Sequence, residues 1–322
     1  MEDNLIEVRN LKMYFKERPD KLLSFKPSYL KAVDNVSFAI KKGETFGLVG
    51  ESGSGKSTIG KCILKYYDIT DGKIFFEDTE IGQLKEKELL PYRKKMQSIF
   101  QDPYSSLDPS KTVSEIVCEP MEIHNLYTKS ERRAKVAEFT QLVGLSKGDL
   151  LKYPHEFSGG QRQRISIARA LSIHPSFVLC DEPISSLDVS LQAQIVKLLK
   201  DLQDKFSLTY LFISHQLQVV QQICDNIGVM YLGNIVEISS SDKLYQNPLH
   251  PYTKMLISSI LEPDPLVKSL DHIVLDSGVK TLGTGGCKFY GRCQYATNKC
   301  KEVTPVLQEV EPGHLVACHL YE

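Results

Sequence analysis

The sequence contains no run of about twenty uninterrupted apolar residues, the length that a helix needs to cross a bilayer. Its first ten residues, MEDNLIEVRN, carry acidic side chains early and lack the basic and then apolar layout of a secretory signal peptide. We therefore expect the chain to remain in the cytoplasm. Glycine and proline, with 20 and 15 of the 322 residues, are too few for a collagenous or disordered chain.

An excess of charge is also missing, because 39 Lys and Arg residues are balanced by 40 Asp and Glu residues. The formal net charge of -1 at pH 7 gives no overall basic field that would attract nucleic acid or an anionic bilayer. Hydrophobic residues (42%) and charged residues (25%) occur at the levels of an ordinary globular protein. At about 150 residues per domain, the length favours two domains and is sufficient to bury a large core.

The order of apolar segments predicts an α/β fold. Short apolar runs predict strands over 5–11, 33–40, 45–49, 73–76, 96–100, 177–180 and 210–214. The amphipathic segment 189–206 predicts a helix between the last two strands, and together they form the crossover unit of a parallel sheet. Residues 16–30, which are rich in Lys and Pro, are predicted to form a loop insertion.

Residues 111–172 are predicted to be mostly helical. Thr128 and Glu131 have the spacing of a capping box. Apolar residues then recur at helical spacing, at Val136, Phe139, Leu142 and Val143. After about residue 240 the pattern weakens into a predicted linker that contains Pro248, Pro251, Pro263 and Pro265.

Residues 50–57, GESGSGKS, match the phosphate-binding pattern G-x-x-x-x-G-K-[ST] at every constrained position. Glycines allow backbone N–H groups to surround phosphate oxygens, and the dipole of the helix predicted over 57–66 favours the anion. We expect Lys56 to reach the β- and γ-phosphates of ATP and Ser57 to bind Mg²⁺. The residues expected to contact the nucleotide are Gly50, Ser52, Gly53, Ser54, Gly55, Lys56, Ser57 and Thr58.

Two acidic residues follow the predicted strand 177–180. A phosphate-binding loop needs a carboxylate at the end of a neighbouring strand to hold Mg²⁺ through water, and Asp181 provides one. Glu182 follows it and is expected to act as the base or to position the attacking water.

The segment Phe157-Ser158-Gly159-Gly160-Gln161 closely resembles the LSGGQ signature of ABC-type ATPases, with Phe in the first position. Its serine and glycines lie where a helix is expected to begin, so that N–H groups and a hydroxyl can bind an anion. A second anion site is unexpected in a monomer with one phosphate-binding loop. The resemblance supplies a reason, because in this family the signature of one subunit closes over the nucleotide of the other.

Other positions match the same family in order. Gln101 matches the glutamine that senses Mg²⁺ and couples to the membrane partner, and Asp188 lies in the segment that resembles the D-loop. His215 matches the histidine that contacts the γ-phosphate. Phe15 falls where an aromatic ring stacks on adenine; Tyr14 is a rival, and either residue could simply belong to the core.

The resemblance implies an α/β fold with an ABC nucleotide-binding domain over 1–240. This domain is expected to contain a RecA-like sheet, an antiparallel β subdomain and a helical subdomain over about 102–172. A small cysteine-rich domain is expected over 241–322. Every catalytic position is intact, which argues for ATP hydrolysis. The implied catalytic residues are Lys56, Gln101, Glu182 and His215, and the implied Mg²⁺ ligands are Ser57, Gln101 and Asp181.

Residues 47–53, 230–233 and 247–253 resemble the oligopeptide/dipeptide importer branch, and the insertion at 16–30 is typical of its OppF or DppF type subunit. This implies a second ATPase of OppD or DppD type, two transmembrane permease subunits and, indirectly, an extracytoplasmic solute-binding protein. The expected location is the cytoplasmic face of the membrane. Alternatives are a nickel or small-solute importer, or a soluble ABC ATPase acting on nucleic acid or ribosomes. One cassette, no heptad run and no basic stripe disfavour the soluble ATPase.

The C-terminal cysteines strengthen this branch assignment. Cys287, Cys293, Cys300 and Cys318 match a motif that the family associates with a [4Fe-4S] cluster. Four cysteines equally satisfy structural Zn²⁺, although zinc sites more often use closely spaced pairs, and the wide spacing favours the cluster. Four unligated thiols are the third alternative. The other four cysteines are scattered, and Cys180 is expected in the core.

Overall fold

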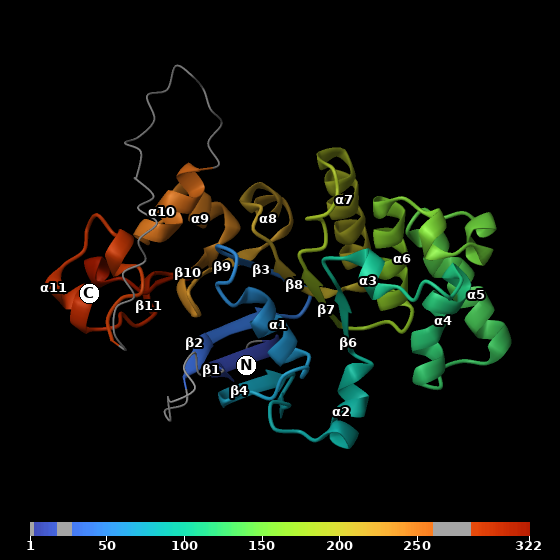
Figure 1. The fold of residues 1–322 in the computed structure, drawn as a ribbon, viewed down its shortest axis with the longest axis horizontal. Coiled ribbons are helices and arrows are strands. Elements are labelled where there is room, and N and C mark those ends of the chain that lie inside the picture. The colour runs from blue at the N-terminus through green and yellow to red at the C-terminus, as the bar shows by residue number, and fades with distance from the viewer. Residues whose placement is uncertain (1–2, 18–27, 260–284) are drawn as a thin grey trace, which may run out of the picture.

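The computed structural model describes residues 3–17, 28–259 and 285–322. It confirms the α/β fold class, with two sheets, a helical lobe at one end and the C-terminal region at the other (Figure 1). Most of the insertion expected at 16–30 lies outside the described residues, as do Pro263 and Pro265 of the predicted linker.

The larger sheet has the strand order β11-β12-β10-β9-β3-β8-β7-β6. Its centre is parallel, since β3 pairs with β8 and β9, β8 with β7, and β7 with β6. Every residue of β3, β7 and β8 is buried, as expected of parallel strands that are covered on both faces. The five parallel strands are β3 (Thr45–Val49), β6 (Met96–Ile99), β7 (Phe177–Asp181), β8 (Thr209–Ile213) and β9 (Asn226–Tyr231).

Each face of this sheet has its own core, because successive side chains of a strand point to opposite faces. Val178 and Cys180 of β7 pack toward α6 (Gly159–Leu171), α7 (Val189–Phe206) and α8 (Leu217–Ile223). Phe177 and Leu179 pack toward α1 (Lys56–Ile63) and the smaller sheet. The predicted crossover from β7 through α7 to β8 is confirmed, as is the buried position of Cys180. Helix α1 ends earlier than the predicted 57–66.

The smaller sheet is antiparallel, with the order β2-β1-β4-β5. Its strands are β1 (Asn4–Lys16), β2 (Tyr29–Lys41), β4 (Asp71–Phe76) and β5 (Thr79–Glu80). β1 and β2 are longer than predicted, and Lys16 pairs with Tyr29. The two ends of the predicted loop at 16–30 are therefore strands, because the apolar pair of Phe15 with Leu30 extends the ladder to this point.

The predicted helical insertion is confirmed. Thr128 caps the N-terminus of α5, where its hydroxyl and the carboxylate of Glu131 form the expected capping box. Val136, Phe139 and Val143 are buried in the core of this lobe. Between β5 and α6 lie α2 (Glu86–Arg93), β6, α3 (Pro103–Ser106), α4 (Val113–Ile123), α5 (Lys129–Leu142), η1 (Lys147–Leu151) and η2 (Pro154–Glu156).

The predicted linker is wrong over 241–258. β10 (Asn234–Ser240) is followed directly by α9 (Ser241–Gln246), and Pro251 begins α10 (Pro251–Ser258). Proline at the first position of a helix loses no hydrogen bond, so it begins a helix here instead of interrupting one.

The C-terminal region joins the larger sheet. β12 (His314–Val316) pairs with β10 and with β11 (Gln308–Glu311), so its hydrogen bonds cross the boundary predicted near residue 240. The remaining elements are short: η3 (Tyr290–Arg292), α11 (Asn298–Glu302) and η4 (His319–Tyr321). Within the described ranges, no helix combines the length and apolar character required to cross a bilayer.

Candidate functional site

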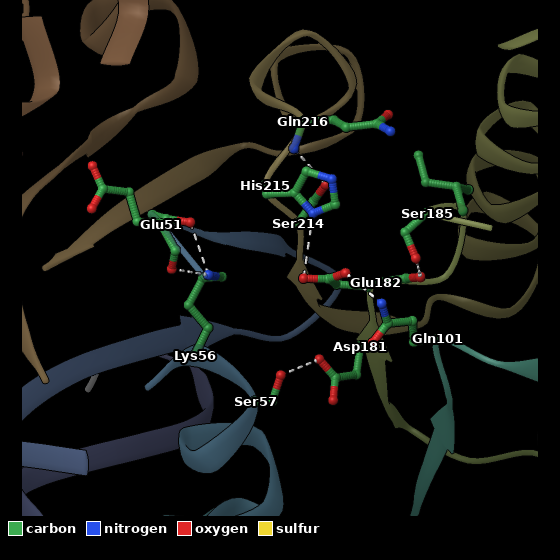
Figure 2. Close-up of polar contacts among 12 residues, drawn as sticks. Glu51, Lys56, Ser57, Gln101, Asp181, Glu182, Ser185, Ser214, His215 and Gln216 are labelled. Carbon is green, nitrogen blue, oxygen red and sulfur yellow. Dashed lines mark hydrogen bonds and ion pairs between the residues drawn. The ribbon is translucent and has the colours of Figure 1, made fainter. Parts of the chain in front are cut away.

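Four loops that follow parallel strands meet at one edge of the larger sheet. The loop after β3 carries Lys56, β7 ends at Asp181, and His215 and Gln101 follow β8 and β6. Figure 2 shows these side chains gathered around Glu182 and the start of α1. The carboxyl ends of neighbouring parallel strands point the same way, so residues distant in the sequence converge here.

Two glycines of the phosphate-binding loop pack closely against the backbone of neighbouring segments. Gly50 has φ 148° and Gly55 has φ 105°, backbone conformations that residues with a side chain rarely adopt. A Cβ atom on Gly50 would lie 2.1 Å from the carbonyl oxygen of Met230, and one on Gly55 would lie 2.1 Å from that of Ala32. Both glycines are therefore required by space as well as by conformation.

Lys56 is buried, and its ammonium group is held inside the loop. Nζ donates to the carbonyl oxygens of Gly50 at 2.8 Å and Glu51 at 2.9 Å, and lies 3.3 Å from the Ser54 hydroxyl. Burial lowers the pKa of Lys56, while the nearby carboxylates, led by that of Glu182, oppose this effect. The loop thus holds one cation where the phosphates of a nucleotide would lie.

Ser57 and Asp181 form the oxygen pair suited to Mg²⁺. The Ser57 hydroxyl donates to Asp181 Oδ1 at 2.7 Å. Burial raises the pKa of Asp181, and the hydrogen bond from Ser57 partly offsets this effect. Mg²⁺ is commonly bound through one or two carboxylates together with substrate phosphates, so this pair fits the ion. Gln101, the third expected ligand, is directed elsewhere, because its Nε2 donates to Glu182 Oε2 at 2.9 Å.

Glu182 lies between two polar side chains. Its carboxylate accepts from Gln101 on one side and lies 3.4 Å from His215 Nδ1 on the other. Its backbone has φ 50°, an unusual value for a residue other than glycine, and its N–H donates to Ile213 O at 2.9 Å. The backbone hydrogen bond to β8 and the contacts with Gln101 and His215 fix the carboxylate at the edge of the sheet.

The signature segment begins α6, as expected. Ser158 is the N-cap residue: its Oγ accepts from Gln161 N at 3.4 Å, and its own N–H donates to Gln161 Oε1 at 3.0 Å. Ser158 and Gly159 are exposed, whereas Gly160 is buried against Leu191. Across the described ranges, the hydrogen bonds of Ser158 stay within its own helix start, and α6 belongs to the helical lobe (Figure 1).

Two residues expected near the nucleotide, Asp188 and Tyr14, form hydrogen bonds with neighbouring groups of the chain. Asp188 caps α7, with Oδ1 accepting from Leu191 N at 2.9 Å. The Tyr14 hydroxyl donates to Asp34 Oδ1 at 2.5 Å, and burial together with this bond raises the pKa of Tyr14. Phe15 has no hydroxyl group to form such a hydrogen bond. Its ring packs edge-on against Tyr67, with ring centroids 5.3 Å apart. This favours Phe15 over Tyr14 as the ring available to a base.

Glu51 occupies an unconstrained position of the loop pattern, but the structure gives it three partners. Its N–H donates to Tyr252 Oη at 2.9 Å, and its carboxylate oxygens lie 3.0 and 3.1 Å from Arg292 Nη1. Its carbonyl is a ligand of Lys56. The available signal was that Glu51, Tyr252 and Arg292 all belong to segments that resemble the importer branch.

The four C-terminal cysteines, Cys287, Cys293, Cys300 and Cys318, line one pocket. Burial and the three neighbouring thiols raise the pKa of Cys287 to about 11. Within the described part of the chain, no group of three or more His, Cys, Asp or Glu side chains is placed to hold a single metal ion.

Comparisons with known proteins agree with this geometry. Residues 33–185 match the ABC transporter family, and residues 236–300 match the family described as the oligopeptide/dipeptide transporter C-terminal region. The putative oligopeptide transport ATP-binding protein YkfD of Bacillus subtilis is 52% identical over 98% of this chain and 95% of that protein. The oligopeptide transport ATP-binding protein OppF of Bacillus subtilis is 48% identical over 99% of this chain and 97% of that protein.

Solved structures with the same fold are ATP-binding cassettes. The cassette MJ0796, in a dimeric post-hydrolysis state bound to ADP and phosphate, is 27% identical with a TM-score of 0.65, covering 73% of this chain and 98% of that chain. Clostridium perfringens cbiO1, part of the ABC transporter complex cbiONQ, is 26% identical with a TM-score of 0.66, covering 76% and 92%. This chain therefore belongs to the ABC transporter family, as an ATP-hydrolysing subunit of its oligopeptide/dipeptide branch.

Proposed function

We propose that this chain is the ATPase subunit that energises an importer of oligopeptides or dipeptides, at the cytoplasmic face of the membrane. The observation that carries the proposal is the similarity to oligopeptide transport ATP-binding proteins along nearly the entire chain. It includes the C-terminal region, which a general ATP-binding cassette does not need. The nickel or small-solute importer remains the second candidate, because the solute contacts other chains.

The proposed partners would complete an ATP site that is shared between two subunits. We propose a heterodimer with a second ABC ATPase of OppD or DppD type, on two permease subunits that receive solute from an extracytoplasmic binding protein. The exposed Ser158 and Gly159 support this arrangement, because they begin a helix of the helical lobe, whereas the phosphate-binding loop lies at the edge of the larger sheet. A similar cassette is dimeric in its solved structure. The balanced charge offers no support for a nucleic acid partner.

In the proposed mechanism, each residue acts on one part of the nucleotide. The backbone of 50–57 and Lys56 hold the β- and γ-phosphates, and Phe15 contacts adenine. Ser57 and Asp181 would hold Mg²⁺, which neutralises charge on the transferring phosphoryl group. Glu182 orients the water whose oxygen bonds to the γ-phosphorus as the bond to the leaving ADP oxygen breaks. His215, with Gln101 and the signature serine of the partner, stabilises the developing charge.

Glu182→Gln is expected to retain ATP binding and to lower kcat of the assembled complex by about 10²–10⁴-fold, because the amide is a far weaker base than the carboxylate. Phosphate release measures the rate, and size-exclusion chromatography with ATP is expected to show the trapped closed dimer. Glu86→Gln removes an exposed carboxylate paired with Arg93 and is the matched control. Wild-type hydrolysis by Glu182→Gln would show that the water is positioned by another group.

Extraction from native membranes in mild detergent tests the proposed assembly. We expect two multispanning proteins and a second ABC ATPase to co-purify with this chain, because its helical lobe and signature are completed by those partners. Mass spectrometry of the purified particle identifies them. Recovery of ribosomes, nucleic acid or soluble partners alone would contradict the importer and favour the soluble ATPase.

We also propose that Cys287, Cys293, Cys300 and Cys318 hold a [4Fe-4S] cluster, with Zn²⁺ as the alternative. The supporting observation is that the four thiols, which lie up to 31 positions apart in the sequence, line one pocket. A cluster takes four thiolates on separate iron atoms, so its cysteines lie further apart than those of a zinc site.

Protein purified without oxygen is expected to absorb visible light and to contain about four iron and four sulfide per chain. Cys293→Ser should lose both signals, because it removes one of the four ligands. Cys118→Ser, on a half-buried thiol of α4 outside the pocket, should retain both. Colourless protein with one zinc per chain, or with no metal, would refute the cluster.

A further inference from the structure

We propose that Arg292 and Tyr252 are positioning residues of the ATP site, which act by holding Glu51 of the phosphate-binding loop. Both lie in the C-terminal region, after the sequence of the cassette core has ended. The inference goes beyond the proposed function, since it depends neither on the transported solute nor on what the cysteines bind.

The first contact is between side chains. Arg292 Nη1 lies 3.0 Å from one carboxylate oxygen of Glu51 and 3.1 Å from the other, across 241 positions of sequence. The Arg292 side chain is 21% exposed and that of Glu51 is 42% exposed, so the pair is only partly screened by water. Hydrogen bonds between two charged groups are stronger than those between neutral groups.

The second contact holds the backbone of the same residue. Glu51 N donates to the hydroxyl of Tyr252, whose side chain is fully buried near the start of α10. Because Lys56 binds the Glu51 carbonyl, the N–H, the carbonyl and the carboxylate of Glu51 each have a partner. A residue held at three points has little freedom to reorient the N–H groups that follow it in the loop.

Arg292 and Tyr252 are in turn held in place by packing within an aromatic cluster. The rings of Tyr231, Tyr252 and Phe289 lie with centroids 4.6–5.5 Å apart. The Arg292 guanidinium lies 5.8 Å from the ring centroid of Tyr231 and 5.7 Å from that of Phe289. Tyr231 follows Met230, the residue whose carbonyl confines Gly50. The first half of the loop is therefore held by side chains and backbone groups of β9, α10 and the segment 289–292.

The ion pair also compensates a charge that would otherwise oppose nucleotide binding. Glu51 belongs to the same loop as Lys56, whose ammonium group donates to the Glu51 carbonyl oxygen at 2.9 Å. An unpaired carboxylate on this loop would repel a triphosphate. Arg292 offsets this charge while fixing the side chain, so its loss should weaken nucleotide binding more than folding.

The test compares full-length variants by two measurements: affinity for the non-hydrolysable ATP analogue adenylyl imidodiphosphate with Mg²⁺, and the Tm without nucleotide. Arg292→Met is expected to weaken binding by about two- to fivefold, the range of a partly exposed charged pair. Arg292→Lys should recover part of the loss. Arg9→Met removes the similar exposed pair with Glu7 on β1, far from the loop in sequence, and should bind as the wild type does.

A double variant separates a direct pair from two independent effects. Glu51→Gln combined with Arg292→Met should bind the analogue no more weakly than the weaker of the single variants. Tyr252→Phe keeps the ring in its cluster and removes only the acceptor of the Glu51 N–H, so it should also weaken binding without unfolding the chain. Losses that multiply in the double variant, or unchanged affinity in Arg292→Met and Tyr252→Phe, would overturn the proposal. Because the isolated chain is measured, failure here says nothing about transport.

Discussion

The ATP site depends on the parallel pairing of five strands around β3. Their carboxyl ends open at one edge of the sheet, so the phosphate-binding loop, Asp181 with Glu182, His215 and Gln101 arrive there from separate segments. Burial on both faces fixes the strands, because a slip in register would move buried side chains out of their cores. The confinement of Gly50 by Met230 shows how little room the loop has once these strands are paired.

The helical lobe and the C-terminal region lie at opposite ends of the molecule (Figure 1). The helical lobe presents the exposed signature at the start of α6, where a nucleotide bound to a second subunit would complete its hydrogen bonds. The C-terminal region contacts the loop of its own chain through Arg292 and Tyr252. Binding energy for ATP would thus come from three parts of the assembly, and only the loop is common to all P-loop enzymes.

Much of this arrangement could be predicted from local sequence. Strands such as 45–49 and 177–180 are short apolar runs, the loop has a fixed pattern, and the capping box at Thr128 marks its helix. Contacts that depend on tertiary packing could not be predicted: the pairing of β12 with β10, the helix that Pro251 begins, and the three partners of Glu51. The choice between Phe15 and Tyr14 needed the position of Asp34, which no local pattern reveals. The roles of the site residues in catalysis stay predictions.

A transport assay can show whether ATP hydrolysis at this site drives peptides across a membrane. The purified complex would be placed in lipid vesicles with its solute-binding protein, and uptake of labelled di- and oligopeptides would be followed with ATP or ADP on the side of this chain. We expect peptide accumulation with ATP and none with ADP. ATP hydrolysis with accumulation of nickel but of no peptide, or with no uptake of any solute, would contradict this expectation.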